Sequence, residues 1–407
     1  MTAPGSPCNH RHAQDEPAAY PFPAEDGLIL SEAYAAAQET DGLVRVQLPY
    51  GEPAWLVTRY ADARLVLGDA RFSRTLAAHN DVPRVTSANN TNGILAMDPP
   101  EHTRLRSLVT KAFTPRRVEA LRPRIRELAV ELVDDMVETG QPADLVERFA
   151  LPLPTAVICD LLGVPVTDRP QIRELIDAWL STSLLSSEEF EERREVLRDY
   201  MRGIIEAHRV APSDDMTTGL IEAHDALPML SESQLADLCV GILTSGHENT
   251  SSQIANFVYV LLDSREKWEQ LLADPLLIPA AVEELTRLVP LVGAGSSFPR
   301  YAKEDVEVGG SLIRAGEPVV VALGAANRDP VQFDEPGVLE FARRKNRQHI
   351  GFGHGPHHCP GAGLSRLELQ EALRALLTRL PGLVLAGDAV WKPQSVVRAP
   401  WALPVGW

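Results

Sequence analysis

The sequence predicts a mainly α-helical protein with a minor β part, built as a single large domain. Long stretches repeat apolar residues every three to four positions, which is the period of an amphipathic helix. Short segments near the two ends of the chain are instead rich in β-branched and apolar residues. No Gly/Ser-rich or Pro-rich linker divides the 407 residues, although this length would allow two or three domains.

The elements can be assigned in chain order. Residues 1–30 are rich in Pro, Ala and polar residues and predict an irregular N-terminal arm, so that the domain spans 31–407. Residues 44–48 alternate apolar and polar side chains, and 55–58 follow a Gly-Glu-Pro turn, which predicts a hairpin. Helical spacing covers 119–137, 153–162, 188–208, 234–262 and 364–380, with prolines 115, 152, 165 and 290 as boundaries and short strands at 306–308 and 318–322.

Charge, hydropathy and cysteine usage exclude several classes of protein. The net charge of −17 disfavours nucleic acid and anionic membranes as partners. No apolar run reaches the roughly 18 residues of a membrane span, and the first thirty residues lack a secretory signal pattern. The four cysteines (Cys8, Cys159, Cys239 and Cys359) are far apart, which is typical of a reducing compartment. We therefore expect a cytoplasmic protein.

Residues 351–361 (Gly-Phe-Gly-His-Gly-Pro-His-His-Cys-Pro-Gly) are the most informative stretch of the chain. Glycine permits positive φ and a close approach of a flat ligand to the backbone. Cys359 precedes a predicted helix, whose N-terminal N–H groups favour a thiolate. A single thiolate with backbone donors suits an axial ligand of a haem iron.

Two other interpretations of this stretch remain open on the residues alone. A lone cysteine beside a helix start is often only a small buried hydrophobe. The cluster of His354, His357, His358 and Cys359 could instead bind zinc. Zinc sites usually take ligands from two separated pairs, whereas these four candidates fall within six residues.

The spacing Phe-Gly-x-Gly-x-His-x-Cys-x-Gly resembles the haem-ligand loop of the cytochrome P450 family. The resemblance covers roughly residues 30–405. It implies the cytochrome P450 fold, haem b as the cofactor and Cys359 as the iron ligand. It also implies an oxidoreductase that activates dioxygen to oxidise a small organic molecule.

Further motifs match the same family in the same order. Glu284 and Arg287 are three apart on a predicted helix and resemble the family's Glu-x-x-Arg pair, for which Arg343 is the matching third member. Such a triad would be structural. The resemblance also implies four contacts to haem propionates, namely His102, Arg106, Arg300 and His357.

The longest predicted helix contains Gly246, Glu248, Asn249 and Thr250, which resemble the family's oxygen-activating segment. Gly246 would open a groove for dioxygen or, alternatively, permit a close helix crossing. Glu248 could relay protons. The chain departs from the family at Asn249, where Thr is usual, and Thr250 lies about 100° further around the helix. We therefore expect Asn249, a water or the substrate to complete proton delivery.

The family resemblance implies a small-molecule substrate, dioxygen, and electrons from a ferredoxin and ferredoxin reductase. Segments 75–95, 291–298 and 394–397 would line the substrate pocket. The first is rich in amides and hydroxyls, which favours a polar cyclic secondary metabolite, peptide-derived or aromatic, and either hydroxylation or C–C/C–N coupling. An acidic ferredoxin could dock on basic residues near the cysteine, at positions 104, 111, 116, 117, 344, 345, 347 and 366. The alternative function is a non-catalytic haem sensor or carrier.

Overall fold

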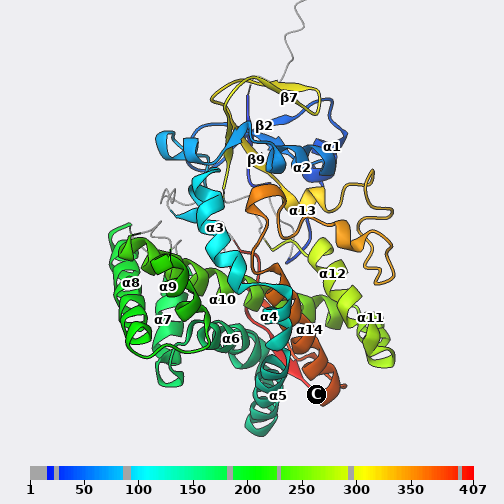
Figure 1. Ribbon diagram of the computed structural model, residues 1–407. Coiled ribbons are helices and arrows are strands. Elements are labelled where there is room, and N and C mark those ends of the chain that lie inside the picture. Colours follow the sequence, from blue (N-terminus) through cyan, green and yellow to red (C-terminus); the bar gives the residue numbers. More distant parts are fainter. Residues whose placement is uncertain are drawn as a thin grey trace, which may run out of the picture.

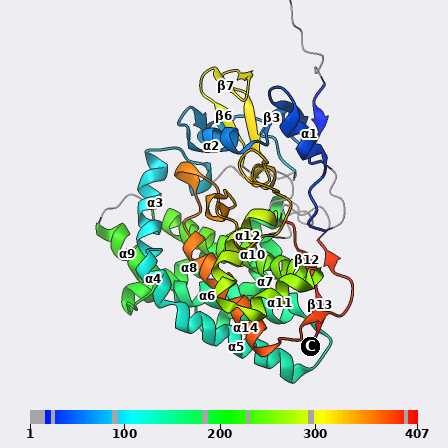
Figure 2. The same cartoon turned by 90° about the vertical axis from the view of Figure 1, so that its right-hand side faces the viewer.

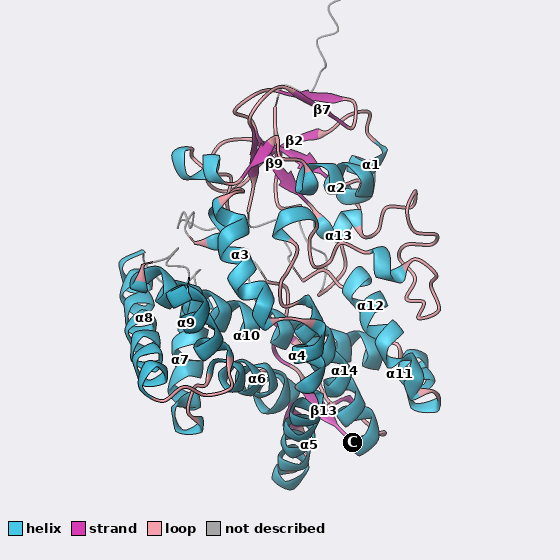
Figure 3. Ribbon diagram, viewed as in Figure 1, coloured by secondary structure: helices cyan, strands magenta, loops and turns pink. Residues whose placement is uncertain are grey.

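The computed structural model describes residues 16–22, 27–85, 93–180, 187–226, 231–291, 298–392 and 397–407. Helices make up the larger part of the molecule, and most strands gather at one end (Figure 1). Colouring by secondary structure shows the same separation (Figure 3), and it persists after a 90° rotation (Figure 2). The predicted mainly α fold with a minor β part is confirmed.

The helices of the described residues vary widely in length. They are α1 (Ala33–Glu39), α2 (Tyr60–Gly68), α3 (Glu101–Ala112), α4 (Pro115–Ala120), α5 (Arg122–Thr139), α6 (Pro152–Leu162), α7 (Arg169–Leu180), α8 (Ser187–Val210), α9 (Met216–Ala226), α10 (Glu232–Asp263), α11 (Arg265–Ala273), α12 (Ile278–Leu288), α13 (Leu323–Ala326) and α14 (Ala362–Arg379). The predicted helix at 119–137 is divided between α4 and α5, whereas those at 153–162, 188–208, 234–262 and 364–380 correspond to α6, α8, α10 and α14.

The largest sheet joins strands from residues 18–73 to strands from residues 300–321. Its strands follow the order β1 (Ala18–Ala19), β2 (Val44–Gln47), β3 (Ala54–Val57), β9 (Pro318–Val321), β6 (Arg300–Ala302) and β4 (Phe72–Ser73). The remaining strands are β5 (Ala143–Asp144), β7 (Val306–Val308), β8 (Ser311–Ile313), β10 (Val384–Leu385), β11 (Val390–Trp391), β12 (Pro400–Ala402) and β13 (Pro404–Gly406). The predicted hairpin is confirmed, because Val44 pairs antiparallel with Leu56.

Part of the predicted N-terminal arm is joined to this sheet. Ala18 pairs in parallel with Val46, and the neighbouring Tyr20 is buried. Residues 1–15 and 23–26 lie outside the described part of the chain, so the boundary at residue 31 stays a prediction. Among the described residues, no helix is long and apolar enough to cross a membrane.

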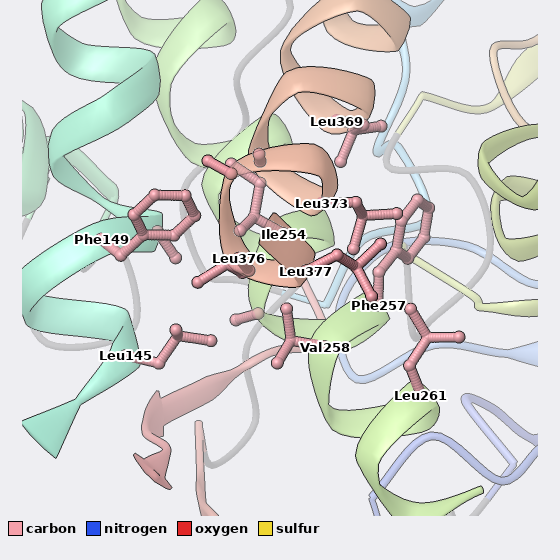
Figure 4. Close-up of a cluster of buried hydrophobic side chains, with 14 of the residues drawn as sticks. Leu145, Phe149, Ile254, Phe257, Val258, Leu261, Leu369, Leu373, Leu376 and Leu377 are labelled. Carbon is pink, nitrogen blue, oxygen red and sulfur yellow. The ribbon is translucent and has the colours of Figure 1, made fainter. Parts of the chain in front are cut away.

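The main hydrophobic core lies between α10 and α14. Ile254, Phe257 and Val258 of α10 face Leu373 and Leu376 of α14 across this core (Figure 4). Each fully buried Leu, Ile or Phe side chain contributes about 1.5–3 kcal/mol of transfer free energy. The core therefore fixes the spacing between the helix that follows Cys359 and the helix that carries residues 246–250.

The start of α10 is fixed by a capping box. The Ser231 hydroxyl accepts the backbone N–H of Gln234, and the Gln234 side chain accepts the backbone N–H of Ser231. The two bonds satisfy donors that a helix N-terminus otherwise leaves free. These contacts fix the residue at which α10 begins, and the position of the first turn then decides which side chains of α10 face each neighbouring element.

Candidate active site

Cys359 ends a tight loop that is closed by backbone contacts. Its N–H donates to the carbonyl of Phe352 at 2.9 Å, and α14 begins three residues later. Gly353 and Gly355 have φ angles of 77° and 71°, which L side chains rarely adopt. A Cβ on Gly355 would also lie 2.4 Å from the carbonyl oxygen of Leu67. The loop therefore requires glycine at these two positions.

The surroundings of the Cys359 thiol oppose the effect of its burial. Burial raises the pKa of the thiol, whereas the N–H groups of Gly361 and Ala362 and the guanidinium groups of Arg106 and Arg366 act to lower it. A bound metal ion deprotonates a coordinating thiol outright. Across the described ranges, no group of three or more His, Cys, Asp or Glu residues is placed to hold a metal ion. The zinc interpretation of the histidine-rich loop thus has no geometric support.

Four basic residues, here called the basic cluster (Arg74, His102, Arg300 and His357), meet beside this loop. Arg74, His102 and Arg300 are only 6%, 2% and 4% exposed. The rings of His102 and His357 lie 4.1 Å apart between centroids. The residues come from four separate segments, next to β4, in α3, in β6 and in the cysteine loop. The predicted residues His102, Arg300 and His357 are therefore brought together.

The nearby carboxylate of Asp98 offsets the positive charge of the basic cluster only in part. Burial, followed by repulsion from Arg300, lowers the pKa of Arg74 well below its usual value. Burial lowers the pKa of Arg300 to about 10, and burial together with Arg74 and its basic neighbours lowers the pKa of His357 to about 2. Two buried donors or acceptors, Arg74 Nη2 and His357 Nδ1, have no hydrogen-bond partner within the described residues. Such orphaned groups indicate a site for an anionic ligand.

Arg74 is the member of the cluster that the sequence did not predict. It directly follows β4, whose Ser73 pairs with Tyr301 of β6, so that Arg74 comes to lie near Arg300. Its guanidinium also lies 4.6 Å above the ring centre of Phe298. The nearby carboxylate of Asp98 accepts the backbone N–H of Arg74 at 2.8 Å. No local signal distinguishes Arg74 from a surface arginine, because its position depends on strand pairing.

Arg106, the remaining predicted propionate contact, lies between the cluster and the cysteine loop. It is half-buried on α3, one turn after His102, and its guanidinium donates to the carbonyl oxygen of His358. Burial lowers the pKa of the Arg106 guanidinium. Arg106 therefore connects α3 to the residue directly before Cys359.

One face of α10 remains exposed in the middle of an otherwise buried helix. Gly241, Ser245 and Asn249 are exposed and are spaced four residues apart, so that they lie on one face. The Asn249 amide donates to the carbonyl of Ser245 at 3.4 Å. Thr250 is buried and donates to the Ser365 hydroxyl of α14 at 3.3 Å. Asn249 and Thr250 thus face different neighbours.

Gly246 lies at a close approach between α10 and α6. A Cβ at this position would be 2.8 Å from Cδ1 of Ile158. The contact matches the alternative of a close helix crossing and accounts for the small residue, while the predicted groove for dioxygen stays a prediction. Ile158 and Leu243 belong to a second buried cluster that joins α6 with α10.

Glu248 forms an ion pair that the sequence did not predict. The Lys392 ammonium lies 3.4 Å from Oε1 of Glu248, and the two side chains are 12% and 13% exposed. Lys392 follows β11, and its Nζ also lies 5.1 Å from the ring centre of Trp401 on β12. A segment 144 residues away in the chain therefore holds the carboxylate that could relay protons.

The predicted triad of Glu284, Arg287 and Arg343 is confirmed. Glu284 and Arg287 have fully buried side chains joined at 2.7 Å and 2.9 Å, and Arg343 Nε lies 2.8 Å from Glu284. Arg287 also donates to the carbonyls of Asn327 and Pro336. The triad thus ties α12 to the segment before the cysteine loop.

The predicted pocket-lining segments are described only in part, because residues 86–92, 292–297 and 393–396 lie outside the described residues. The basic residues of the predicted docking surface are better described. Arg104, Arg116, Arg117, Arg344, Lys345 and Arg347 are exposed. Arg366 is half-buried and pairs with Glu283. The side chain of Lys111 is not described.

Comparisons with known proteins agree with this geometry. The cytochrome P450 family model matches residues 24–397. A mycinamicin IV hydroxylase/epoxidase of Micromonospora griseorubida is 52% identical over 395 residues, covering 96% of this chain and 99% of that protein. A nocardicin C N-oxygenase of Nocardia uniformis subsp. tsuyamanensis is 46% identical over 393 residues, covering 95% and 98%.

Solved structures show the same similarity in three dimensions. The mixed-function P450 MycG has a TM-score of 0.91 to this chain at 52% identity, with 96% of this chain and all of that chain covered. With a family match over most of its length and relatives above 30% identity, the chain belongs to the cytochrome P450 family of haem-iron enzymes and is a monooxygenase of secondary-metabolite biosynthesis.

Proposed function

We propose that this P450 inserts oxygen into a polar cyclic secondary metabolite, with haem b held by the Cys359 thiolate. One observation carries the cofactor part of the proposal. A loop that requires glycine presents a half-buried cysteine beside the basic cluster, in which Arg74 Nη2 and His357 Nδ1 have no hydrogen-bond partner among the described residues. Haem propionates would supply carboxylate partners for these groups, since arginine grips carboxylates through parallel hydrogen bonds.

Each basic residue would have a distinct part in holding the cofactor. Arg74 and Arg300 are the more buried cations, so they would gain most from a carboxylate. His102 and His357 would donate from their rings, and Arg106 would bridge a propionate and the carbonyl of His358. When bound, the haem iron supplies the dioxygen-activating chemistry.

The exposed face of α10 would supply the proton path. The Asn249 side chain can both donate and accept a hydrogen bond, as the usual threonine would. Glu248 would pass protons towards Asn249 from solvent. Thr250 is directed towards Ser365, so in this proposal it supports the helix pairing. Gly246 would keep α10 close to α6 and would thereby hold this face of α10 in a fixed position.

The names of the relatives give the first substrates to test. The relative at 52% identity acts on mycinamicin IV, and the one at 46% is named for nocardicin C. We propose mycinamicin IV or a compound of similar size and polarity as the first candidate. Electrons would come from a ferredoxin that docks on the exposed basic residues of α4 and of the segment 344–347, with its own reductase.

Substrate binding and labelled turnover test this proposal. Mycinamicin IV and nocardicin C should be titrated against the purified holoenzyme, and binding should shift the haem Soret band. Turnover under isotope-labelled dioxygen should then place one labelled oxygen atom in the product. An unlabelled product that has lost only hydrogen would instead show coupling or desaturation and would contradict oxygen insertion.

A further inference from the structure

A second buried charge network lies beside the predicted triad and has a different set of partners. Glu283 of α12 receives Arg366 Nε at 2.6 Å on one oxygen and Arg366 Nη2 at 3.1 Å on the other. The second oxygen also lies 3.1 Å from His349 Nε2. The side chains of Glu283 and His349 are 7% and 1% exposed. The network therefore joins α12, α14 and the start of the cysteine loop.

The hydrogen bonds assign the tautomer of His349. Its Nδ1 accepts the backbone N–H of Gly351 at 3.0 Å, so this nitrogen carries no proton. Nε2 must then carry the proton and donate it to Glu283. Although burial alone would raise the pKa of Glu283, hydrogen bonds from His349 and Arg366 lower it to about 2. The carboxylate is thus ionised and can accept from both neighbours.

The same arginine reaches the residue that closes the cysteine loop. The Arg366 guanidinium lies 4.5 Å above the ring centre of Phe352. The carbonyl of Phe352 in turn accepts the N–H of Cys359 at 2.9 Å. One connected path therefore runs from buried Glu283, through Arg366 and Phe352, to the backbone of the cysteine. The His349–Gly351 contact fixes the other end of the same loop.

We propose that Glu283, His349 and Arg366 are positioning residues that hold the Phe352 ring and backbone against Cys359, and so set the orientation of the sulfur. The part concerning the sulfur rests on the proposed haem ligation. The triad cannot replace this clamp, because Glu284, Arg287 and Arg343 bind the segment 327–343 and, among the described residues, form no hydrogen bond or ion pair with residues 349–359. Two neighbouring glutamates on α12 thus anchor two successive parts of the chain.

Amide exchange in the purified holoenzyme tests the clamp without using activity. Arg366→Met removes the bonds to Glu283 and the stacking on Phe352. We expect exchange at the Gly351 and Cys359 amides to rise about tenfold, since a hydrogen bond to a charged group is lost. The matched control is Arg126→Met, because Arg126 makes the same two-bond contact, at 2.8 Å and 3.4 Å, to the buried Glu371 far from this loop. This control should leave both amides unchanged.

His349→Asn separates the two contacts of the histidine. An Asn side chain can accept the N–H two residues later, as in an Asx turn, but it cannot reach Glu283 as the imidazole does. We expect Gly351 to stay protected in this variant, whereas the reduced carbonyl complex of the holoenzyme loses part of its long-wavelength Soret band. Arg366→Lys, which keeps charge but not the stacking, should fall between the wild type and Arg366→Met.

The outcomes distinguish this inference from the proposed function. Equal loosening of the two amides in Arg366→Met and Arg126→Met would show that the network only adds global stability and would overturn the clamp. Unchanged exchange in Arg366→Met would overturn it as well. If the wild-type holoenzyme lacked the long-wavelength band, haem-thiolate ligation would be wrong, while the exchange experiment would still decide whether the clamp exists.

Discussion

The two sides of the candidate haem site are built in different ways. On the cysteine side, two required glycines, two buried charge networks and a backbone bond to Phe352 leave the loop few alternative positions. On the α10 side, the face that carries Asn249 is exposed. The contacts of Glu248 include an ion pair with Lys392, which comes from a distant segment of the chain. In the proposed function, the fixed side holds the cofactor, and the open side contacts the substrate and carries the proton path.

Breaking the triad should have the largest effect, because it removes the support of the fixed side. Glu284→Ala or Arg287→Ala leaves a buried charge without its partner, which costs about 3–5 kcal/mol. We expect low soluble yield and poor haem incorporation in both variants. Yield and the haem-to-protein ratio are the measurements. Normal haem content in either variant would mean that the triad does not support the loop.

Arg74→Met tests the basic cluster and should have opposite effects in the two forms of the protein. Without the cofactor, removing a buried cation that repels Arg300 should leave the free energy of unfolding unchanged or higher. With the cofactor, the loss of a charged hydrogen bond should weaken haem retention about 10- to 100-fold. Denaturant unfolding and haem transfer to an acceptor protein measure the two effects.

The control for Arg74 is Arg314→Met, the same substitution at an exposed arginine that pairs with Asp305. It should change neither property. Equal haem retention in Arg74→Met and Arg314→Met would exclude Arg74 from cofactor binding, and the cluster would then need another explanation.

On the open side, Asn249→Ala should separate electron use from product formation. Because the amide can both donate and accept, its loss should raise peroxide release per product about tenfold while substrate binding is retained. Asn249→Thr restores a small donor and acceptor and should keep at least partial activity. Peroxide and product are measured together. Full coupling in Asn249→Ala would remove this residue from proton delivery.

Lys392→Met should give the smallest change in peroxide release, because the position of the Glu248 carboxylate depends only in part on its ion pair with Lys392. Losing a half-buried pair worth about 1 kcal/mol should raise the peroxide-to-product ratio about fivefold. Lys392→Arg should restore the ratio, and Lys303→Met, an exposed lysine elsewhere, serves as the control. A lower melting temperature with an unchanged ratio would assign Lys392 a structural role alone.

The cysteine loop and the triad could be predicted from the sequence because most of their signals are local. The glycines and the cysteine lie within eleven residues, Glu284 and Arg287 are one helical turn apart, and the α10 and α14 periods are long. Arg74 and Lys392 could not be predicted in the same way. Arg74 reaches the cluster only because β4 pairs with β6, and Lys392 reaches Glu248 only because the C-terminal segment returns to α10. Long-range pairing of this kind leaves no local pattern.

The break between α4 and α5 shows a similar limit. The apolar period continues through residues 119–137, but α4 ends at Ala120 and Pro123 lies in the first turn of α5. Proline is favoured there because the first turn of a helix does not need its missing N–H group. The period alone therefore predicted one helix. The role of Gly246 also depended on its neighbour, because only the position of Ile158 reveals the close crossing.

The carbonyl spectrum of the reduced holoenzyme tests the central claim most directly. If Cys359 ligates the haem iron as a thiolate, the purified wild-type protein should show the long-wavelength Soret band that thiolate ligation gives. Cys359→Ser should lose this band, whereas Cys239→Ser, at a buried cysteine in α10, should keep it. A Cys359→Ser protein that retained the wild-type band would contradict haem-thiolate ligation at this residue.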